Sequence, residues 1–348
     1  MGDVPHTSET EIPRHSRSDV GFEGEVVDEI TSDQYNAASA EIEERLSHVR
    51  EVARNSIRDL SKDQPPTIYH YTTSSGLLGI LSTNRLFATH ASYVNDTTEI
   101  SYCVSLIDDA LDECLGGDTT EAGVELVRRV RATVNVFEGY LGAFISCFCE
   151  DGDLLSQWRG YSGDQTGYAL GFSTRELSLR WHDLRPEQRF DLVRVIYDES
   201  EQRSRISQIV GPMWKVFNVM LKSKGEIVAY AAMPSCCKFL EQELLYYLVS
   251  FKSPAFAEEK EWRLVYLRTL SDEADPLRFR PVGSLLVPYV ELDPTPQAGV
   301  NTGRVPLGDL VCGPTAHPEL VVRAADMLLR HQGIAFAQVR PSAIPLRP

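Results

Sequence analysis

Short apolar runs alternate along this chain with helical stretches of unequal length. The runs at 142–150 and 168–172 have the composition of buried β-strands, whereas 199–250 is a long helical region with turn signals near Gly225 and Pro234. A doubly wound fold needs strands and helices that alternate evenly, so this spacing favours the α+β class. We expect one main domain with a mixed, split β-sheet of mostly short strands, flanked by helices.

A proline pair, Pro65-Pro66, separates this main domain (65–348) from a helical N-terminal arm. Residues 1–30 are polar without an apolar period, which predicts a disordered or loosely attached arm. Apolar residues at helical spacing then predict a helix within 31–64; they are Ile42, Leu46, Val49, Ala53 and Leu60. We expect this stripe to dock on the main domain; the alternative is a homodimer through this helix.

The individual elements follow from apolar patterns and turn residues. Strands are predicted at 68–72, 86–89, 142–150, 168–172, 190–197, 261–267, 285–290, 305–312 and 334–340. Helices are predicted from Thr73 to Leu81, 97–114, 121–139, as a turn at 153–160, in two or three pieces over 199–250, and at 318–331.

Composition excludes several classes of protein. No run of about 18 apolar residues could span a membrane, and the N-terminus has no basic, apolar leader. The seven cysteines show no zinc-type spacing, so we expect free thiols, a cytoplasmic protein and no metal. The formal net charge of −16 opposes general nucleic-acid binding.

Four polar motifs lie in or beside apolar runs, where polar groups are costly to bury. The first two are Tyr69-His70-Tyr71-Thr72 and Ser156-Gln157-Trp158-Arg159-Gly160-Tyr161. The third, Asn95-Asp96-x-x-Glu99, also fits an acidic helix start. In the fourth, Glu258-Glu259-Lys260-Glu261-Trp262-Arg263, alternation puts Glu259, Glu261 and Arg263 on one strand face. Those carboxylates either form a salt-bridged edge or point into a cleft.

The ordered motifs resemble a large bacterial family known as a domain of unknown function. They are Tyr-His-Tyr-Thr, Asn-Asp-x-x-Glu, Phe-Ile-Ser-Cys-Phe, Trp-x-x-Tyr with Gly-x-x-Leu-Gly-Phe, and Glu-Lys-Glu-Trp-Arg-Leu-Val, spread over about 66–330. The family carries no settled activity.

A more distant resemblance links the chain to ADP-ribosyltransferases. Those enzymes carry a His or Arg on an early strand, a Ser or Tyr on a middle strand and a Glu on a late strand. Here His70, then Ser146 or Tyr161, then Glu261 follow in that order, and Glu259-Lys260-Glu261 is similar to the Glu-x-Glu of the arginine-modifying branch. Ser146 departs from the usual pattern because Cys147 follows it.

This second resemblance implies an enzyme that consumes NAD as its substrate. Glu261, Glu259 and His70 would be the catalytic set, because a carboxylate stabilises the oxocarbenium-like state of the ribose. Arg159 or Arg85 could hold the pyrophosphate, Tyr71 or Tyr161 could stack on nicotinamide, and Ser146 and Trp158 could complete the pocket. By analogy, such an enzyme would be a toxin or phage-defence effector, with a protein or nucleic-acid acceptor and a cognate inhibitor.

Two alternatives stay open. The protein could be a non-catalytic module that binds a nucleotide or a protein, in which case the carboxylates are structural. It could also be a metal-dependent nuclease using Asp96, Glu99 and Glu261, although its low basicity opposes this. The NAD hypothesis places His70, Trp158, Tyr161 and Glu261 around one cleft; pairing of Glu261 with Arg263 would favour the structural alternative.

Residues 1–30 should be dispensable for folding because they offer little apolar surface to bury. Limited proteolysis should remove them and leave a stable core. The melting temperature of the trimmed protein should stay within a few degrees of that of the full chain, and a larger drop would contradict the expectation.

Overall fold

A computed structural model describes residues 31–94, 98–116, 120–140, 142–161, 166–178, 190–267, 277–294, 303–334 and 336–345. The arm 1–30 and Asp96 lie outside these ranges. The helices are α1 (Ser32–Leu60), α2 (Ser74–Thr83), α3 (Thr98–Leu115), α4 (Glu121–Tyr140), α5 (Leu155–Tyr161), α6 (Thr174–Ser178), α7 (Glu199–Lys224), α8 (Glu226–Leu248) and α9 (Pro318–His331), with short 3-10 helices η2 (Ala91–Tyr93) and η4 (Pro254–Glu259).

The strands are β1 (Thr67–Thr72), β2 (Leu86–His90), β3 (Ala143–Cys149), β4 (Tyr168–Ser173), β5 (Phe190–Arg194), β6 (Glu261–Leu267), β7 (Arg278–Val282), β8 (Leu285–Leu292), β9 (Leu307–Cys312) and β10 (Gln338–Pro341). They form one mixed sheet in the order β10-β9-β4-β1-β3-β2-β8-β7, and β6 joins β3 to β5. The pair β9 and β10 is parallel. The α+β class and the mixed sheet expected from the sequence are confirmed.

The sheet branches at β3, and this branch positions the cleft. One edge of β3 pairs with β6 along its whole length, from Ala143 to Cys149. The other edge is shared, because β2 pairs with Phe144 and Ile145 while β1 pairs only with Cys149. Strands β1 and β2 therefore diverge, and the edge of β3 between them, at Cys147, faces a gap instead of a strand.

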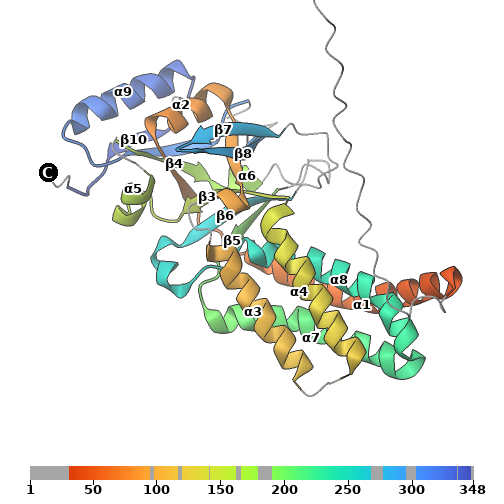
Figure 1. Cartoon of the computed structure of the whole chain (residues 1–348). Coiled ribbons are helices and arrows are strands. Elements are labelled where there is room, and N and C mark those ends of the chain that lie inside the picture. The colour runs from red at the N-terminus through yellow and green to blue at the C-terminus, as the bar shows by residue number, and fades with distance from the viewer. Residues whose placement is uncertain are drawn as a thin grey trace, which may run out of the picture.

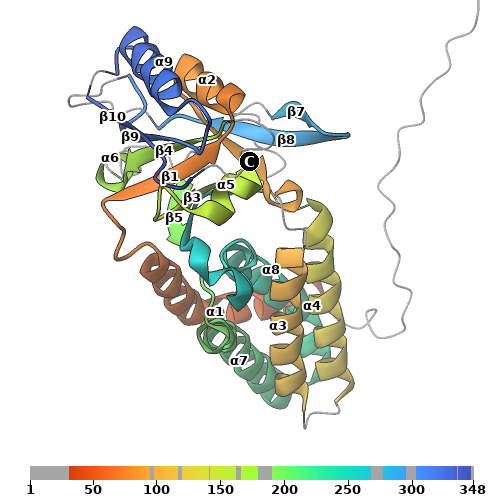
Figure 2. The same ribbon diagram turned by 90° about the vertical axis from the view of Figure 1, so that its left-hand side faces the viewer.

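Helices cover the sheet on two sides (Figures 1 and 2). Helices α2 and α9 pack on one face, where Leu81 and Leu329 join a core with Phe148 and Phe172. A layer of α1, α3, α4, α7 and α8 lies on the other side and forms a second core that includes Ile145 and Val265 of the sheet. No helix in the described ranges is both long and apolar enough to cross a bilayer.

Helix α1 belongs to that second layer. Its predicted apolar stripe is buried in the helical core, in contact with α7 and α8. Polar contacts fix its register, since Arg205 of α7 and Tyr247 of α8 both donate to the hydroxyl of Ser56, each at 2.8 Å. The stripe thus docks within its own chain, as favoured from the sequence.

Two details of the sequence prediction were wrong. Pro234 does not interrupt α8, which continues to Leu248. A proline removes one helical hydrogen bond, but Met233 and Cys236 are fully buried on either side of it, and their packing holds the helix. Strand β7 was not predicted, because it is an edge strand with mostly exposed side chains and contains Pro281, which discourages a strand interpretation.

Leu46→Ala should destabilise the protein by about 2–5 kcal/mol, because the side chain of Leu46 on α1 is fully buried in the helical core. Val52→Ala, on an exposed part of the same helix, should change stability by less than about 0.5 kcal/mol. Urea denaturation measures both, and the midpoint should not depend on protein concentration. A concentration-dependent midpoint, or equal effects of the two changes, would mean that α1 docks elsewhere.

Candidate functional site

A small cleft, with about 40 Å³ of space for water-sized molecules and open to solvent, lies where β1 leaves β3. Its walls come from β1, β3, α5 and the junction of η4 with β6. The residues that line it are Tyr69, His70, Tyr71, Cys147, Phe148, Cys149, Gln157, Tyr161, Glu259 and Glu261. Segments nearly 200 residues apart in sequence therefore meet at one place.

His70 lies where β1 and β2 diverge along the edge of β3. Its Nδ1 lies 2.9 Å from the carbonyl oxygen of Cys147, the backbone group that faces the gap between β1 and β2. A carbonyl only accepts, so Nδ1 carries the proton, and in the neutral ring Nε2 is an acceptor. Burial lowers the pKa of His70, which keeps the ring neutral at pH 7.

Aromatic rings from β1 and α5 form another part of the cleft wall. Tyr71 is buried, donates its hydroxyl to the carbonyl of Asp151 at 2.8 Å, and accepts from the amide of Leu154 at 2.9 Å. Tyr161 at the end of α5 is 37% exposed and lies at the rim. Burial raises the pKa of both phenols, so both stay protonated.

Trp158 was expected at the cleft but stands behind it. Its ring packs edge-on against Tyr71 with centroids 4.7 Å apart, and its Nε1 donates to Asp153 at 2.8 Å. Trp158 is not among the residues that line the cleft. Trp158 therefore supports the ring of Tyr71 from behind and is not positioned to contact a ligand in the cleft.

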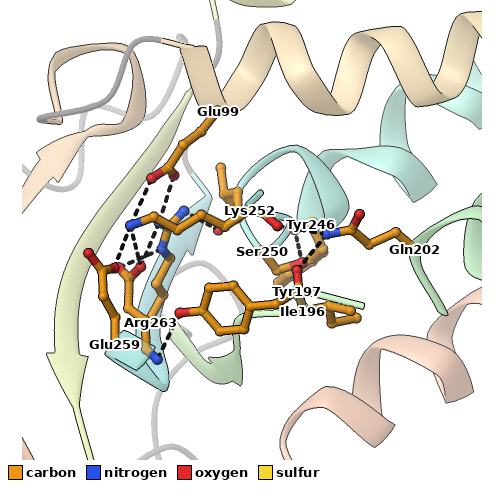
Figure 3. Close-up of polar contacts among 11 residues, drawn as sticks. Glu99, Ile196, Tyr197, Gln202, Tyr246, Ser250, Lys252, Glu259 and Arg263 are labelled. Carbon is orange, nitrogen blue, oxygen red and sulfur yellow. Dashed lines mark hydrogen bonds and ion pairs between the residues drawn. The ribbon is translucent and has the colours of Figure 1, made fainter. Parts of the chain in front are cut away.

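A buried cluster of charges forms the floor (Figure 3). The ammonium of Lys252 lies 2.6 Å from Glu259, 3.0 Å from Glu99 and 3.2 Å from Glu261. Arg263 donates from Nε and Nη2 to the two oxygens of Glu261 at 2.8 and 2.9 Å, and from Nη2 to Glu99 at 2.7 Å. With three carboxylates and two cations, the fully ionised cluster carries one excess negative charge.

The two carboxylates that line the cleft have different environments. Although burial opposes it, the charges of Arg263 and Lys252 lower the pKa of Glu261 to about 2, so it is an anion at neutral pH. Glu259 is less covered, with its side chain 19% exposed, and among the described residues only Lys252 pairs with it. Burial raises the pKa of Glu259, with a contribution from Glu261, which makes it the better proton acceptor.

Local backbone geometry brings these side chains together. Lys260 has φ of 41°, a left-handed conformation that ends η4 and turns the chain into β6, so that Glu259 and Glu261 both reach Lys252. Lys252 lies in the segment that follows α8. The side-chain amide of Gln202 holds this segment, because it donates to the carbonyls of Ile196 and Lys252 at 2.6 and 2.9 Å. Figure 3 shows Glu99 reaching the same point from α3.

Two cysteines line the cleft without the properties of nucleophiles. Burial raises the pKa of Cys147 well above that of an ordinary thiol and raises that of Cys149 to about 12. A reactive cysteine needs a lowered pKa to form its thiolate at pH 7. Thiolate chemistry therefore does not fit this site.

Several predicted residues are not brought to the cleft. Ser146 is buried within the sheet, and its hydroxyl has no hydrogen-bond partner among the described residues. Arg159 is exposed on α5, and Arg85 pairs with Asp293. Neither arginine lines the cleft.

The carboxylates named for a metal-dependent nuclease meet cations instead. Glu99 and Glu261 do approach one another, but Lys252 and Arg263 bridge them. In the described ranges no group of three or more His, Cys, Asp and Glu side chains has the arrangement of a metal site. Asp96 lies outside those ranges.

Sequence reasoning missed Lys252, the residue that links all three carboxylates. A lysine that follows Val249-Ser250-Phe251 at the end of an apolar helix is itself a signal, since lysine is rarely buried without a partner. The partners lie on other elements, however, and no local pattern identifies them.

Stability should depend on pH through Glu261. Its pKa is lowered from 4.5 to about 2 on folding, so its contribution is present above pH 4.5 and is lost as the pH falls toward 2. Glu261→Gln should therefore destabilise the protein by about 3 kcal/mol near pH 7 and by less near pH 3. Urea denaturation at both pH values measures this, with Glu258→Gln as the exposed control. A constant difference would contradict the assignment.

Comparison with known proteins adds one relationship. No curated protein and no solved structure matches this chain. A family model does match, over 157–264, which contains the fourth polar motif and all of the second except Ser156, together with α7, α8 and Lys252. The resemblance to a family without a settled activity is thereby confirmed over this part of the chain: residues 157–264 match the family described as "Protein of unknown function (DUF2971)".

Proposed function

We propose that the cleft binds NAD and breaks its nicotinamide–ribose bond, as an ADP-ribosyltransferase or an NAD glycohydrolase does. One observation carries this proposal: His70, Tyr161, Glu259 and Glu261, selected by the resemblance and scattered over 190 residues, line a single cleft.

The charge of the cleft floor suits this reaction. The nicotinamide group of NAD is cationic, and positive charge moves onto the ribose as the bond breaks. A fixed anion that needs no reorganisation stabilises such a charge most effectively. Glu261 meets this requirement, because Arg263 and Lys252 hold it in place and keep it ionised, while the cluster retains an excess carboxylate.

Glu259 would complete the reaction. When the bond breaks, its electron pair goes to nicotinamide, and the oxygen or nitrogen of an acceptor adds to the ribose carbon and loses a proton. Glu259 can take that proton, because one of its oxygens has no partner among the described residues and its pKa is raised. Tyr161 or Tyr71 would stack on the nicotinamide ring.

A non-catalytic binding module is the second candidate, and one observation favours it. Both oxygens of Glu261 are already paired with Arg263, the arrangement that we expected to favour a structural role. In this alternative the cluster only joins the helical layer to the sheet. A toxin or phage-defence role, an acceptor and a cognate inhibitor follow from the resemblance alone.

Glu261→Gln and Glu259→Gln distinguish the two candidates. If the cleft is catalytic, the wild type releases nicotinamide from NAD without added metal, and Glu261→Gln lowers turnover by about 10²–10³-fold while NAD still binds. Glu259→Gln should spare NAD hydrolysis and impair transfer to an acceptor.

Measurement of nicotinamide release at a temperature where all variants are folded separates lost activity from lost stability. Equal, small losses in both variants would remove Glu261 from the catalytic role. No turnover by the wild type, with destabilisation in both variants, would favour the binding module.

A further inference from the structure

Arg280 on β7 is a half-buried cation for which the described residues offer no carboxylate. Its Nη2 donates to the hydroxyl of Thr89 at 2.8 Å, and its guanidinium lies 5.5 Å from the ring centre of Tyr289. Its Nε is buried without a hydrogen-bond partner. Burial lowers the pKa of Arg280 because only Tyr289 offsets the loss of water. Buried charges are normally paired, so this arginine lacks an anion.

The position of Arg280 connects it to the cleft. Its anchor, Thr89, pairs with Ile145 on β3, and His70 bonds to the carbonyl of Cys147, two residues further along the same strand. Two residues of a strand span about 7 Å, so Ile145, which pairs with Thr89, and Cys147, which bonds to His70, are close together along the edge of β3. The charge of Arg280 also contributes to the low pKa of His70, which places the two side chains within electrostatic reach.

The other cations near the cleft are not available to an anion. Lys252 and Arg263 are neutralised by an excess of carboxylates, and His70 is neutral. An anionic group that enters beside this floor would be repelled by it and would need a separate positive charge. A guanidinium on an aromatic ring, with unused N–H groups, has the geometry that recognises phosphate oxygens.

We propose that Arg280 binds a phosphate group of a nucleotide that occupies the cleft. Thr89 and Tyr289 hold the guanidinium in position, and the phosphate supplies the missing counter-charge. The identity of that nucleotide as NAD or ADP-ribose rests on the proposed function, whereas the phosphate contact does not. None of Arg85, Arg159 and Arg280 is among the residues that line the cleft, so the phosphate would lie just outside it. Arg280 replaces the other two arginines because Arg85 is paired with Asp293 and Arg159 is exposed on α5.

Calorimetric titration with ADP-ribose, inorganic pyrophosphate and adenosine tests the assignment. Arg280→Gln should weaken binding of ADP-ribose by at least tenfold and abolish that of pyrophosphate, and binding of uncharged adenosine should be unchanged. Arg278→Gln is the matched control, because Arg278 lies on the same strand, is half exposed and pairs with Glu291. It should leave all three affinities unchanged.

A second variant covers the case in which Arg280→Gln fails to fold. Thr89→Val keeps the shape of the anchor and removes its hydroxyl, so it should weaken ADP-ribose binding severalfold without changing adenosine binding. Wild-type affinity for ADP-ribose in the folded variants, or no binding of ADP-ribose and pyrophosphate to the wild type, would overturn the inference.

The outcome is independent of the proposed reaction. If binding of ADP-ribose depends on Arg280 but the protein releases no nicotinamide from NAD, the phosphate site is supported and the proposed enzymatic activity is contradicted. If Arg280→Gln releases nicotinamide from NAD with the same KM as the wild type, the enzymatic activity is supported and the phosphate site is contradicted.

Discussion

The contact on which this structure depends is the buried cluster of Glu99, Lys252, Glu261 and Arg263. Its members come from α3, the segment after α8, and β6, so it joins the helical layer to the sheet. Removing charges from water is costly, and only mutual pairing with good geometry offsets this. Because each cation touches at least two carboxylates, displacement of any one element would leave a buried charge uncompensated.

The same cluster connects architecture with chemistry. The branch at β3 opens a gap in the sheet, and the cluster lies at the edge of that gap, where Glu259 and Glu261 reach the cleft. Glu259 adds a third carboxylate to the two cations of this cluster, so one carboxylate is in excess, whereas charge that only stabilised the fold could be balanced. The floor therefore favours positive charge, while Arg280 on the far side of the divergence favours negative charge. A ligand with both kinds of charge matches this polarity.

Most of the fold could be predicted from the sequence, because buried strands and amphipathic helices carry local patterns. Strand β6 and helix α9 were placed to the residue. Edge strand β7 was missed, since exposure removes the apolar pattern. For the site, polar residues in apolar strands identified His70 and Glu261, but Lys252 and Arg280 each also depend on a partner more than 150 residues away, Glu99 and Thr89 respectively. Such proximity is a property of the tertiary structure.

The docking of α1 has a consequence for synthesis of the chain. Helix α1 ends at Leu60, whereas α8, which covers it, ends at Leu248. At about 5–20 residues per second, a ribosome would need roughly 10–40 s to make the intervening chain. For most of that time, until α7 and then α8 have been made, the apolar stripe of α1 has no native partner. The nascent protein thus presents an amphipathic helix to its surroundings before it can fold, and chaperones would meet this surface first.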